Sequence, residues 1–211
     1  MTAMTITLEA SYNKNDAEIC ARQDVFRGFV HVEKVSLKHR LFQSQAYSRI
    51  IQRELVHRPE AAGVLLYDDQ QQKIGLIEQY RIGAMDDPVS PWQLEIIAGL
   101  LDADESAESC VRRESFEESG CHIKALQHLF SFYPSAGACS ELFHLYAAAV
   151  DLPAHGGVFG VADEGENIQL HLIDYADIAT LLTNGRLKNA PVIMALQWLQ
   201  MRQHTAKQTR G

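Results

Sequence analysis

Three glutamates near the middle of the chain have the type and spacing of a carboxylate cluster that binds a divalent cation. Glu114, Glu117 and Glu118 lie three and four residues apart, so on a helix their side chains are neighbours. Their charges repel one another, and they precede Gly120, where the end of a helix dipole already disfavours negative charge. A hard cation such as Mg²⁺ or Mn²⁺ relieves this repulsion and commonly shares its coordination shell with substrate phosphates. The alternative is an acidic helix that only faces solvent.

The residues around these glutamates keep a fixed spacing. Five residues separate Gly99 from Glu105, and seven more precede Arg113. The segment resembles the Nudix box, whose family hydrolyses nucleoside diphosphates linked to another moiety and holds divalent metals with the box glutamates. Aliphatic residues of that pattern are replaced here by Ser115 and Cys121, and we expect both to face the core as small residues. The pattern comprises Gly99, Glu105, Arg113, Glu114, Glu117, Glu118 and Gly120.

Segments outside the box extend the resemblance over nearly the whole chain. Residues 76–81, 91–99, 162–166 and 195–200 resemble the bacterial ADP-ribose pyrophosphatase branch of the family. Members of that branch are homodimers with exchanged N-terminal strands, so the resemblance implies a homodimer here. One difference is Ala136, which stands where the branch usually has a proline. This difference leaves related nucleotide sugars open as substrates.

The resemblance also implies which residues hold the metals. Glu114 and Glu118 are the central ligands, helped by the backbone carbonyl of Ala98. Glu166 assists a metal once its loop closes on the substrate. A carbonyl ligand is compatible with Mg²⁺ or Mn²⁺ because hard cations accept any oxygen donor. We expect more than one ion per site.

Three charged residues of the box receive supporting roles. Glu117 either supports the metal ligands or orients Arg113. Arg113 itself is interpreted as an ion-pair partner on the helix. Glu105 orients Arg113 or caps the turn before the helix.

The general base is assigned by resemblance to Glu164, in a loop that contains four glycines between residues 156 and 165. Glycine gives a loop freedom to move, and moving loops often complete a site when substrate binds. Composition alone favours a solvated turn for this segment, whereas the resemblance favours a loop that takes part in catalysis. Glu117 and Glu141 are the next candidates for the base.

Substrate contacts are expected mostly outside the box. Arginines meet the diphosphate and terminal ribose in the family, which suits a planar donor facing phosphate oxygens; without the resemblance each arginine would be an ordinary surface residue. Phe29 matches the position that stacks on adenine, although a phenylalanine at the start of a strand fits a core equally well. The predicted contacts are Phe29, Val30, Arg53, Glu54, Arg58, Arg81, Leu100, Ser135, Gly137 and Glu141.

Composition excludes several other classes of protein. The chain has 211 residues, 46% of them hydrophobic, which is enough for a full core. The net charge of −8 argues against an extended nucleic-acid surface, which needs clustered Lys and Arg. We find no signal peptide and no apolar stretch of membrane-spanning length. The four cysteines lack paired spacing and are interpreted as small buried residues in a reduced cytoplasm.

The elements that must position these residues alternate between strands and helices, which predicts a mixed α/β fold. Together with the resemblance, this implies a Nudix α/β/α sandwich with a mixed sheet, preceded by an N-terminal antiparallel β-sheet. We place the N-terminal subdomain at residues 1–57, the main domain at 58–204 and a frayed tail at 205–211. Strands are expected at 29–37, 49–56, 61–67, 74–80, 92–98, 126–132, 143–150 and 168–173. The box helix is expected from about 102–105 to Gly120, followed by helices at 175–183 and 190–204.

The sequence thus predicts a metal-dependent hydrolase that cleaves ADP-ribose into AMP and ribose 5-phosphate. One alternative is a Nudix hydrolase of another nucleotide sugar or of a dinucleotide. A second alternative is a sensor that binds ADP-ribose without cleaving it. Sensors of that kind often lose box glutamates, which this chain keeps.

Overall fold

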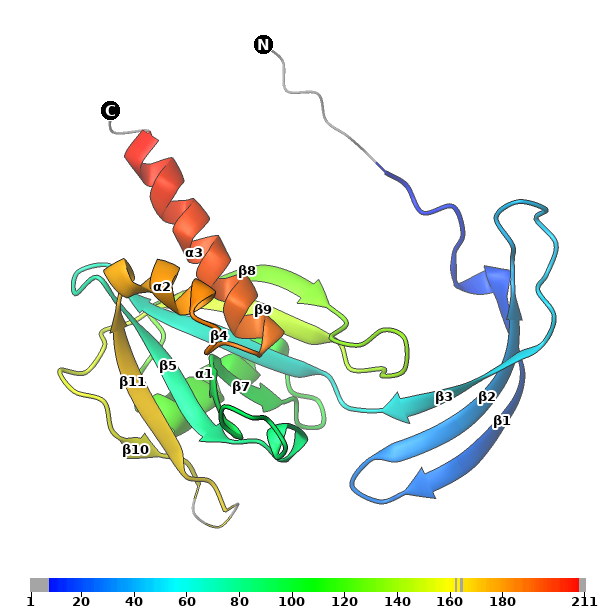
Figure 1. The fold of residues 1–211 in the computed structure, drawn as a ribbon, viewed down its shortest axis with the longest axis horizontal. Helices are drawn as coiled ribbons and strands as arrows, with labels where there is room; N and C mark the ends of the chain where they lie inside the picture. The colour runs from blue at the N-terminus through cyan, green and yellow to red at the C-terminus, as the bar shows by residue number, and fades with distance from the viewer. Residues whose placement is uncertain (1–7, 162, 164, 209–211) are drawn as a thin grey trace. The chain divides into compact units, whose positions relative to one another are not determined.

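The computed structural model describes residues 8–161, 163 and 165–208, and it divides the chain into two compact units (Figure 1). The N-terminal unit contains the described residues up to Arg58 together with Ser135–Ser140. The larger unit contains Pro59–Pro134 and the described residues from Glu141 onward. Ser135–Ser140, which the sequence placed in the larger domain, joins the smaller unit. Val56 of β3 holds it there, because its N–H donates to the Ala138 carbonyl at 2.8 Å and its carbonyl accepts from the Ser140 N–H at 3.0 Å.

The N-terminal unit is a three-stranded antiparallel sheet in the order β1-β2-β3. The strands are β1 (Ala17–Arg27), β2 (His31–His39) and β3 (Ile51–His57). The sequence predicted β2 and β3 but not β1. All eleven residues of β1 are exposed, so its sequence carries none of the alternation that a half-buried strand shows.

A mixed eight-stranded sheet forms the centre of the larger unit. Its main order is β10-β11-β5-β4-β9-β8, while β6 pairs with β5 and β7 with β4. The β4–β9 pair is parallel and the other pairs are antiparallel. The strands are β4 (Ala61–Asp68), β5 (Lys73–Tyr80), β6 (Trp92–Glu95), β7 (Ile97–Leu100), β8 (Ala125–Phe132), β9 (Phe143–Ala149), β10 (Val158–Phe159) and β11 (Ile168–Asp174).

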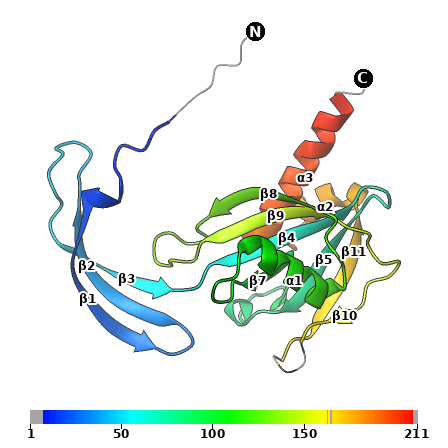
Figure 2. The same cartoon turned by 180° about the vertical axis from the view of Figure 1, so that it is seen from behind.

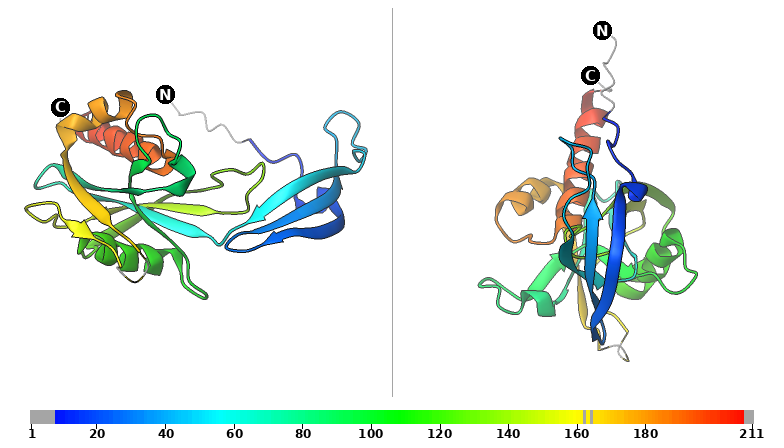
Figure 3. Two further views of the ribbon diagram at one scale, coloured as in Figure 1. Left: turned by 60° about the horizontal axis from the view of Figure 1, so that its bottom comes forward. Right: turned by 90° about the vertical axis from the view of Figure 1, so that its right-hand side faces the viewer.

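Helices cover both faces of this sheet. Helix α1 (Ala107–Ser119) lies on one face (Figure 2), and α2 (Ile178–Thr183) and α3 (Ala190–Gln208) lie on the other (Figure 3, left). Alternate residues of β4 divide between the two cores: Leu65 packs with the α2 and α3 side chains, whereas Val64 and Leu66 pack with those of α1. The predicted mixed α/β class and three-layer arrangement are confirmed.

Two boundaries near the box differ from the prediction. The segment expected to be one strand over 92–98 is two short strands, because β6 pairs with β5 while β7 pairs with β4. The box helix begins after Ser106 rather than at 102–105, since the Ser106 hydroxyl caps it by accepting from the Ser109 N–H at 3.1 Å.

Two further expectations need correction. Helix α3 continues to Gln208 instead of ending near His204. All four cysteines are free, and Cys110 and Cys121 are buried as predicted, but Cys20 on β1 is exposed and Cys139 is half-buried. No helix in the described part of the chain is long and apolar enough to cross a membrane.

Candidate metal and diphosphate site

The box is a strand, a loop and a helix whose ends are fixed by local chemistry. Helix α1 stops at Gly120, which has a left-handed backbone (φ 69°) and donates its N–H to the Phe116 carbonyl at 2.8 Å. Ser115 and Cys121 are buried as expected, and the Ser115 hydroxyl donates to the Cys121 carbonyl at 3.0 Å. The two departures from the motif therefore serve packing at the end of the helix.

Two carboxylates of α1 point back at strand β7. Glu118 is 2% exposed, and its Oε2 accepts a hydrogen bond from the Ala98 N–H at 3.3 Å. Glu114 lies against Gly99 so closely that a Cβ on this glycine would fall 1.7 Å from Glu114 Oε1. The glycine is required here because any side chain would occupy the position of the carboxylate.

Burial and mutual repulsion make this pair unfavourable when both are charged. Burial, and after it the negative charge of Glu114, raises the pKa of Glu118 to about 8. The hydrogen bond from the Ala98 N–H and the positive charge of Arg81 act in the opposite direction and lower this pKa in part. Burial also raises the pKa of Glu114, with the charges of Glu117 and Glu166 adding to it and Arg113 opposing it. A divalent cation stabilises the charged forms of two such neighbouring carboxylates whose pKa values are raised.

Arg113 is the centre of an ion-pair network on the outer side of the helix. Its Nε and Nη2 donate to Glu105 at 3.1 and 2.9 Å, and its Nη1 donates to Glu114 at 2.6 Å and Glu117 at 3.2 Å. These carboxylates, Glu105 foremost, raise the pKa of Arg113 above its ordinary value. Glu105 Oε2 also accepts from the Asp102 N–H at 3.1 Å, so it both orients Arg113 and closes the turn before the helix.

The donor set fits a hard divalent cation. The backbone of Ala98 and the side chains of Glu114 and Glu118 come together, and the atoms that they offer for metal coordination are all oxygens. Glu166 is close enough for its charge to act on both box glutamates. The structure thus brings four of the predicted ligand residues into one region of the larger unit.

The loop that carries the predicted base is only partly described. Glu164 lies outside the described residues. Glu166 is described: its Oε2 accepts from the Val161 N–H at 2.9 Å, and Gly160 (φ 106°) packs beside it. The same loop contains the short strand β10, which the sequence did not predict and which pairs with β11.

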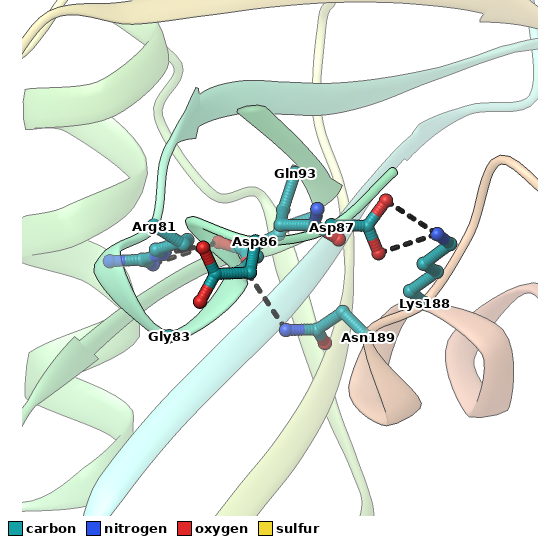
Figure 4. A pocket seen from close by; sticks show the side chains of 9 residues that line it. Arg81, Gly83, Asp86, Asp87, Gln93, Lys188 and Asn189 are labelled. Atoms are coloured by element: carbon teal, nitrogen blue, oxygen red, sulfur yellow. Dashed lines mark hydrogen bonds and ion pairs between the residues drawn. The ribbon is translucent and has the colours of Figure 1, made fainter. Parts of the chain in front are cut away.

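A cavity of about 400 Å³ is lined by Arg81, the residue that follows β5 (Figure 4). Arg81 is fixed by Glu95 on β6, whose Oε2 accepts a hydrogen bond from Nε at 2.9 Å and forms an ion pair with Nη2 at 2.8 Å. Asn189, directly before α3, donates its Nδ2 to Glu95 Oε1 at 2.8 Å. Lys188, the residue before Asn189, also lines the cavity and forms an ion pair with Asp87. Arg81 keeps nearly half of its side chain exposed, so part of its guanidinium is free to meet a ligand.

Most of the other predicted substrate contacts belong to the N-terminal unit. Phe29 is exposed at the turn after β1, with the Arg58 guanidinium carbon 5.9 Å from its ring centre, so it is not a core residue. Arg53 Nη1 donates to the Gln52 carbonyl at 2.8 Å, and Glu54 is exposed beside it on β3. Within this unit also lie the half-buried Val30 and the exposed Ser135 and Gly137, whereas the half-buried Glu141 and Leu100 lie in the larger unit.

Known proteins resemble this chain along most of its length. Residues 57–196 match the NUDIX domain. The ADP-ribose pyrophosphatase of Escherichia coli (strain K12) is 37% identical over 200 residues, covering 95% of each chain. The GDP-mannose pyrophosphatase of Yersinia pestis (strain Pestoides F) is 37% identical over 150 residues, covering 71% of this chain and 75% of that protein.

Solved structures share the fold as well. A crystal structure described as that of an ADP compounds hydrolase superposes with a TM-score of 0.67, covering 91% of this chain and 98% of that chain at 23% sequence identity. The sheet flanked by helices is the fold of a Nudix domain. The chain belongs to the Nudix family.

Two residues beside Arg81 were not foreseen as part of the site. Glu95 is 5% exposed, and Asn189 lies 94 positions further along the chain. Glu95 carried a usable signal, since it is a charged residue between the apolar Leu94 and Ile96 of a strand segment and buried charges are normally paired. Asn189 carried none, because its position before a helix is the ordinary place for a capping residue.

Proposed function

We propose that this protein hydrolyses the diphosphate of ADP-ribose, giving AMP and ribose 5-phosphate, with Mg²⁺ or Mn²⁺ as the required cation. The observation that carries the proposal is the buried Glu118 and half-buried Glu114 against Ala98 and Gly99, a carboxylate pair that a divalent cation would stabilise. The choice of substrate is supported by the 37% identity to an ADP-ribose pyrophosphatase over 95% of both chains.

Each residue of the site has a separate role in the proposed hydrolysis. Glu114, Glu118, Glu166 and the carbonyl of Ala98 hold the cations, whose contribution is to neutralise and polarise the diphosphate. Arg81 contributes a planar guanidinium to the phosphate oxygens. Water attacks one phosphorus, its proton passes to Glu164, and the bond from that phosphorus to the bridging oxygen breaks with the electron pair leaving on the other phosphate.

Contacts to the rest of the substrate are assigned mostly to residues of the N-terminal unit, with Leu100 and Glu141 from the larger unit. Phe29 and Val30 meet the adenine, because an exposed ring offers a stacking surface. Arginine side chains suit the phosphates and terminal ribose for the reason given for Arg81. The remaining assigned contacts are Arg53, Glu54, Arg58, Leu100, Ser135, Gly137 and Glu141.

A second candidate substrate class is another nucleoside diphosphate sugar. The resemblance to a GDP-mannose pyrophosphatase over 71% of this chain supports it, as does Ala136 at the place of the usual proline. Both candidates use the same chemistry at the diphosphate. They differ in the contacts to base and terminal sugar.

A substrate panel tests the proposal. Purified protein is incubated with ADP-ribose, GDP-mannose, other nucleotide sugars and a dinucleotide, with Mg²⁺, and products are identified by chromatography. We expect the highest kcat/KM for ADP-ribose, with AMP and ribose 5-phosphate as products and no turnover in EDTA. Preference for another nucleotide sugar would favour the second candidate. Tight ADP-ribose binding without turnover of any compound would instead identify a sensor.

We further propose a homodimer in the cytoplasm. The sheet of the N-terminal unit buries only Val35 among its large apolar residues, while Ile19, Val25 and Phe26 on β1 are exposed. Such a sheet is normally covered by another layer. Four free cysteines suit a reducing compartment. Sedimentation analysis is expected to give a dimer, and a fully active monomer at assay concentration would contradict this assembly.

A further inference from the structure

The contacts around Glu95 form a chain that ends at Arg81. Glu95 Oε2 accepts a hydrogen bond from Arg81 Nε and forms an ion pair with Arg81 Nη2, and Glu95 Oε1 accepts a hydrogen bond from Asn189 Nδ2. Glu95 is therefore satisfied on both oxygens although it is buried. Two of the three nitrogens of the Arg81 guanidinium are held, which fixes the plane of the group and leaves Nη1 directed away from Glu95.

The side chain of Asn189 does not cap α3, although its position directly before the helix predicts that it would. An asparagine directly before a helix usually accepts a hydrogen bond from an N–H of the first turn through its side-chain oxygen. Asn189 begins α3, since its carbonyl accepts from the Ile193 N–H at 3.4 Å. Its Oδ1 is nevertheless buried without a hydrogen-bond partner in the described part of the chain, while its Nδ2 faces Glu95. The reverse amide orientation would place two oxygens against each other, so Glu95 dictates this arrangement.

Arg81 also lies within electrostatic reach of the box. Glu95, which holds Arg81, lies three residues before Ala98, whose N–H donates to Glu118. An untethered guanidinium would be drawn toward the carboxylates of Glu114 and Glu118. Within the described part of the chain Glu118 is buried without an ion pair, and Glu114 is half-buried and pairs with Arg113 alone. In that position the guanidinium would compete with a divalent cation for the same oxygens.

We propose that Asn189 and Glu95 are positioning residues that hold Arg81 away from Glu114 and Glu118. This chain of contacts from Asn189 through Glu95 to Arg81, here called the tether, keeps the box carboxylates available to the cation and directs the guanidinium toward the diphosphate. Asn189 acts only through Glu95, and Glu95 acts only through Arg81. The inference rests on the proposed metal site but not on the identity of the nucleotide substrate.

Binding of Mn²⁺ alone, without substrate, tests this tether. Electron paramagnetic resonance titration of free Mn²⁺ gives the dissociation constant for wild type and for Asn189→Ala. We expect Asn189→Ala to weaken Mn²⁺ binding about fivefold, and Glu95→Gln to weaken it at least as much. In an Arg81→Ala background the same Asn189 substitution should have no effect, because the competing cation is gone.

The matched control is Lys188→Gln. Lys188 is the neighbour of Asn189, lies on the same cavity wall and forms an ion pair with Asp87, but it does not contact Glu95 or Arg81 (Figure 4). Its Mn²⁺ affinity should equal that of wild type. Thermal unfolding of each variant shows whether it remains folded, and Glu95→Gln supplies a second break in the tether if Asn189→Ala does not fold.

A second readout follows Arg81 directly. The Nε–H of Arg81 donates to a buried carboxylate, so its ¹H–¹⁵N resonance should be protected from exchange in wild type and in Lys188→Gln, and should lose that protection in Asn189→Ala. Unchanged Mn²⁺ affinity and an unchanged resonance in Asn189→Ala would overturn the inference. Equal weakening with and without Arg81 would overturn it too. Failure of wild type to bind Mn²⁺ would contradict the proposed function itself.

Discussion

Gly99 on strand β7 and Glu114 on helix α1 are in such close contact that a single methyl group cannot fit between them. A Cβ on Gly99 would lie 1.7 Å from Oε1 and 2.3 Å from Cδ of Glu114, distances at which real atoms never meet. Gly99→Ala must therefore displace the carboxylate that we assign to the metal. We expect kcat/KM for the preferred nucleotide to fall about 100-fold or more, measured at saturating Mg²⁺.

The control for this substitution is another tightly packed glycine in the same sheet. A Cβ on Gly75 would lie 3.3 Å from Leu152 Cδ2 and 3.4 Å from Leu170 Cδ1, both ends of flexible side chains. Gly75→Ala should change thermal stability slightly and leave kcat/KM unchanged. If Gly99→Ala kept wild-type activity, Glu114 would not be needed at its present position.

Glu118→Gln should separate activity from stability. The substitution removes a ligand charge from the metal site, so turnover should fall by several orders of magnitude. It also removes a carboxylate that is 2% exposed and faces Glu114, so the metal-free protein should be at least as stable as wild type. Activity assays with Mg²⁺ and thermal unfolding in EDTA measure the two effects. Full activity would refute Glu118 as a ligand.

How much of the site the sequence revealed depended on how local its contacts are. The box glutamates, Arg113 and Glu105 lie within 14 residues of one another, so motif spacing placed them correctly. Asn189 reaches Glu95 across 94 residues through the packing of α3 on the sheet, and no periodicity encodes such a contact. The missed strand β1 has the same kind of cause, since every one of its residues is exposed and its register is set only by β2.

The turn between β4 and β5 offers a test of acid stability. Asp68 is buried, which alone would raise its pKa, but the N–H groups of Gln70, Gln71 and Leu152 and the Gln71 side chain donate to it and lower the pKa overall. Because the folded pKa is below the unfolded value of about 3.8, its ionised form stabilises the fold above that pH. That stabilisation is lost as the pH falls through the folded pKa.

Asp68→Asn should therefore destabilise the protein at neutral pH by about 1–3 kcal/mol, since one carboxylate oxygen that accepts hydrogen bonds becomes a donor. The difference from wild type should shrink below about pH 4. Urea unfolding at several pH values measures it. Asp151→Asn serves as the control, because Asp151 is exposed and forms a surface ion pair with Lys124. A difference that stays constant down to pH 2 would show that ionisation of Asp68 does not contribute.

The last prediction concerns the two glutamates of the loop that follows β10. If Glu164 is the base, Glu164→Gln should bind ADP-ribose and Mg²⁺ nearly as well as wild type but turn over about 10²- to 10⁴-fold more slowly. Glu166 interacts electrostatically with Glu114 and Glu118, so Glu166→Gln should instead raise the Mg²⁺ concentration needed for half-maximal activity. Steady-state kinetics at varied Mg²⁺ distinguish the two effects. If Glu164→Gln kept most of its kcat, the base would have to be Glu117 or Glu141, and the corresponding Gln variants would then show the loss of turnover without loss of binding.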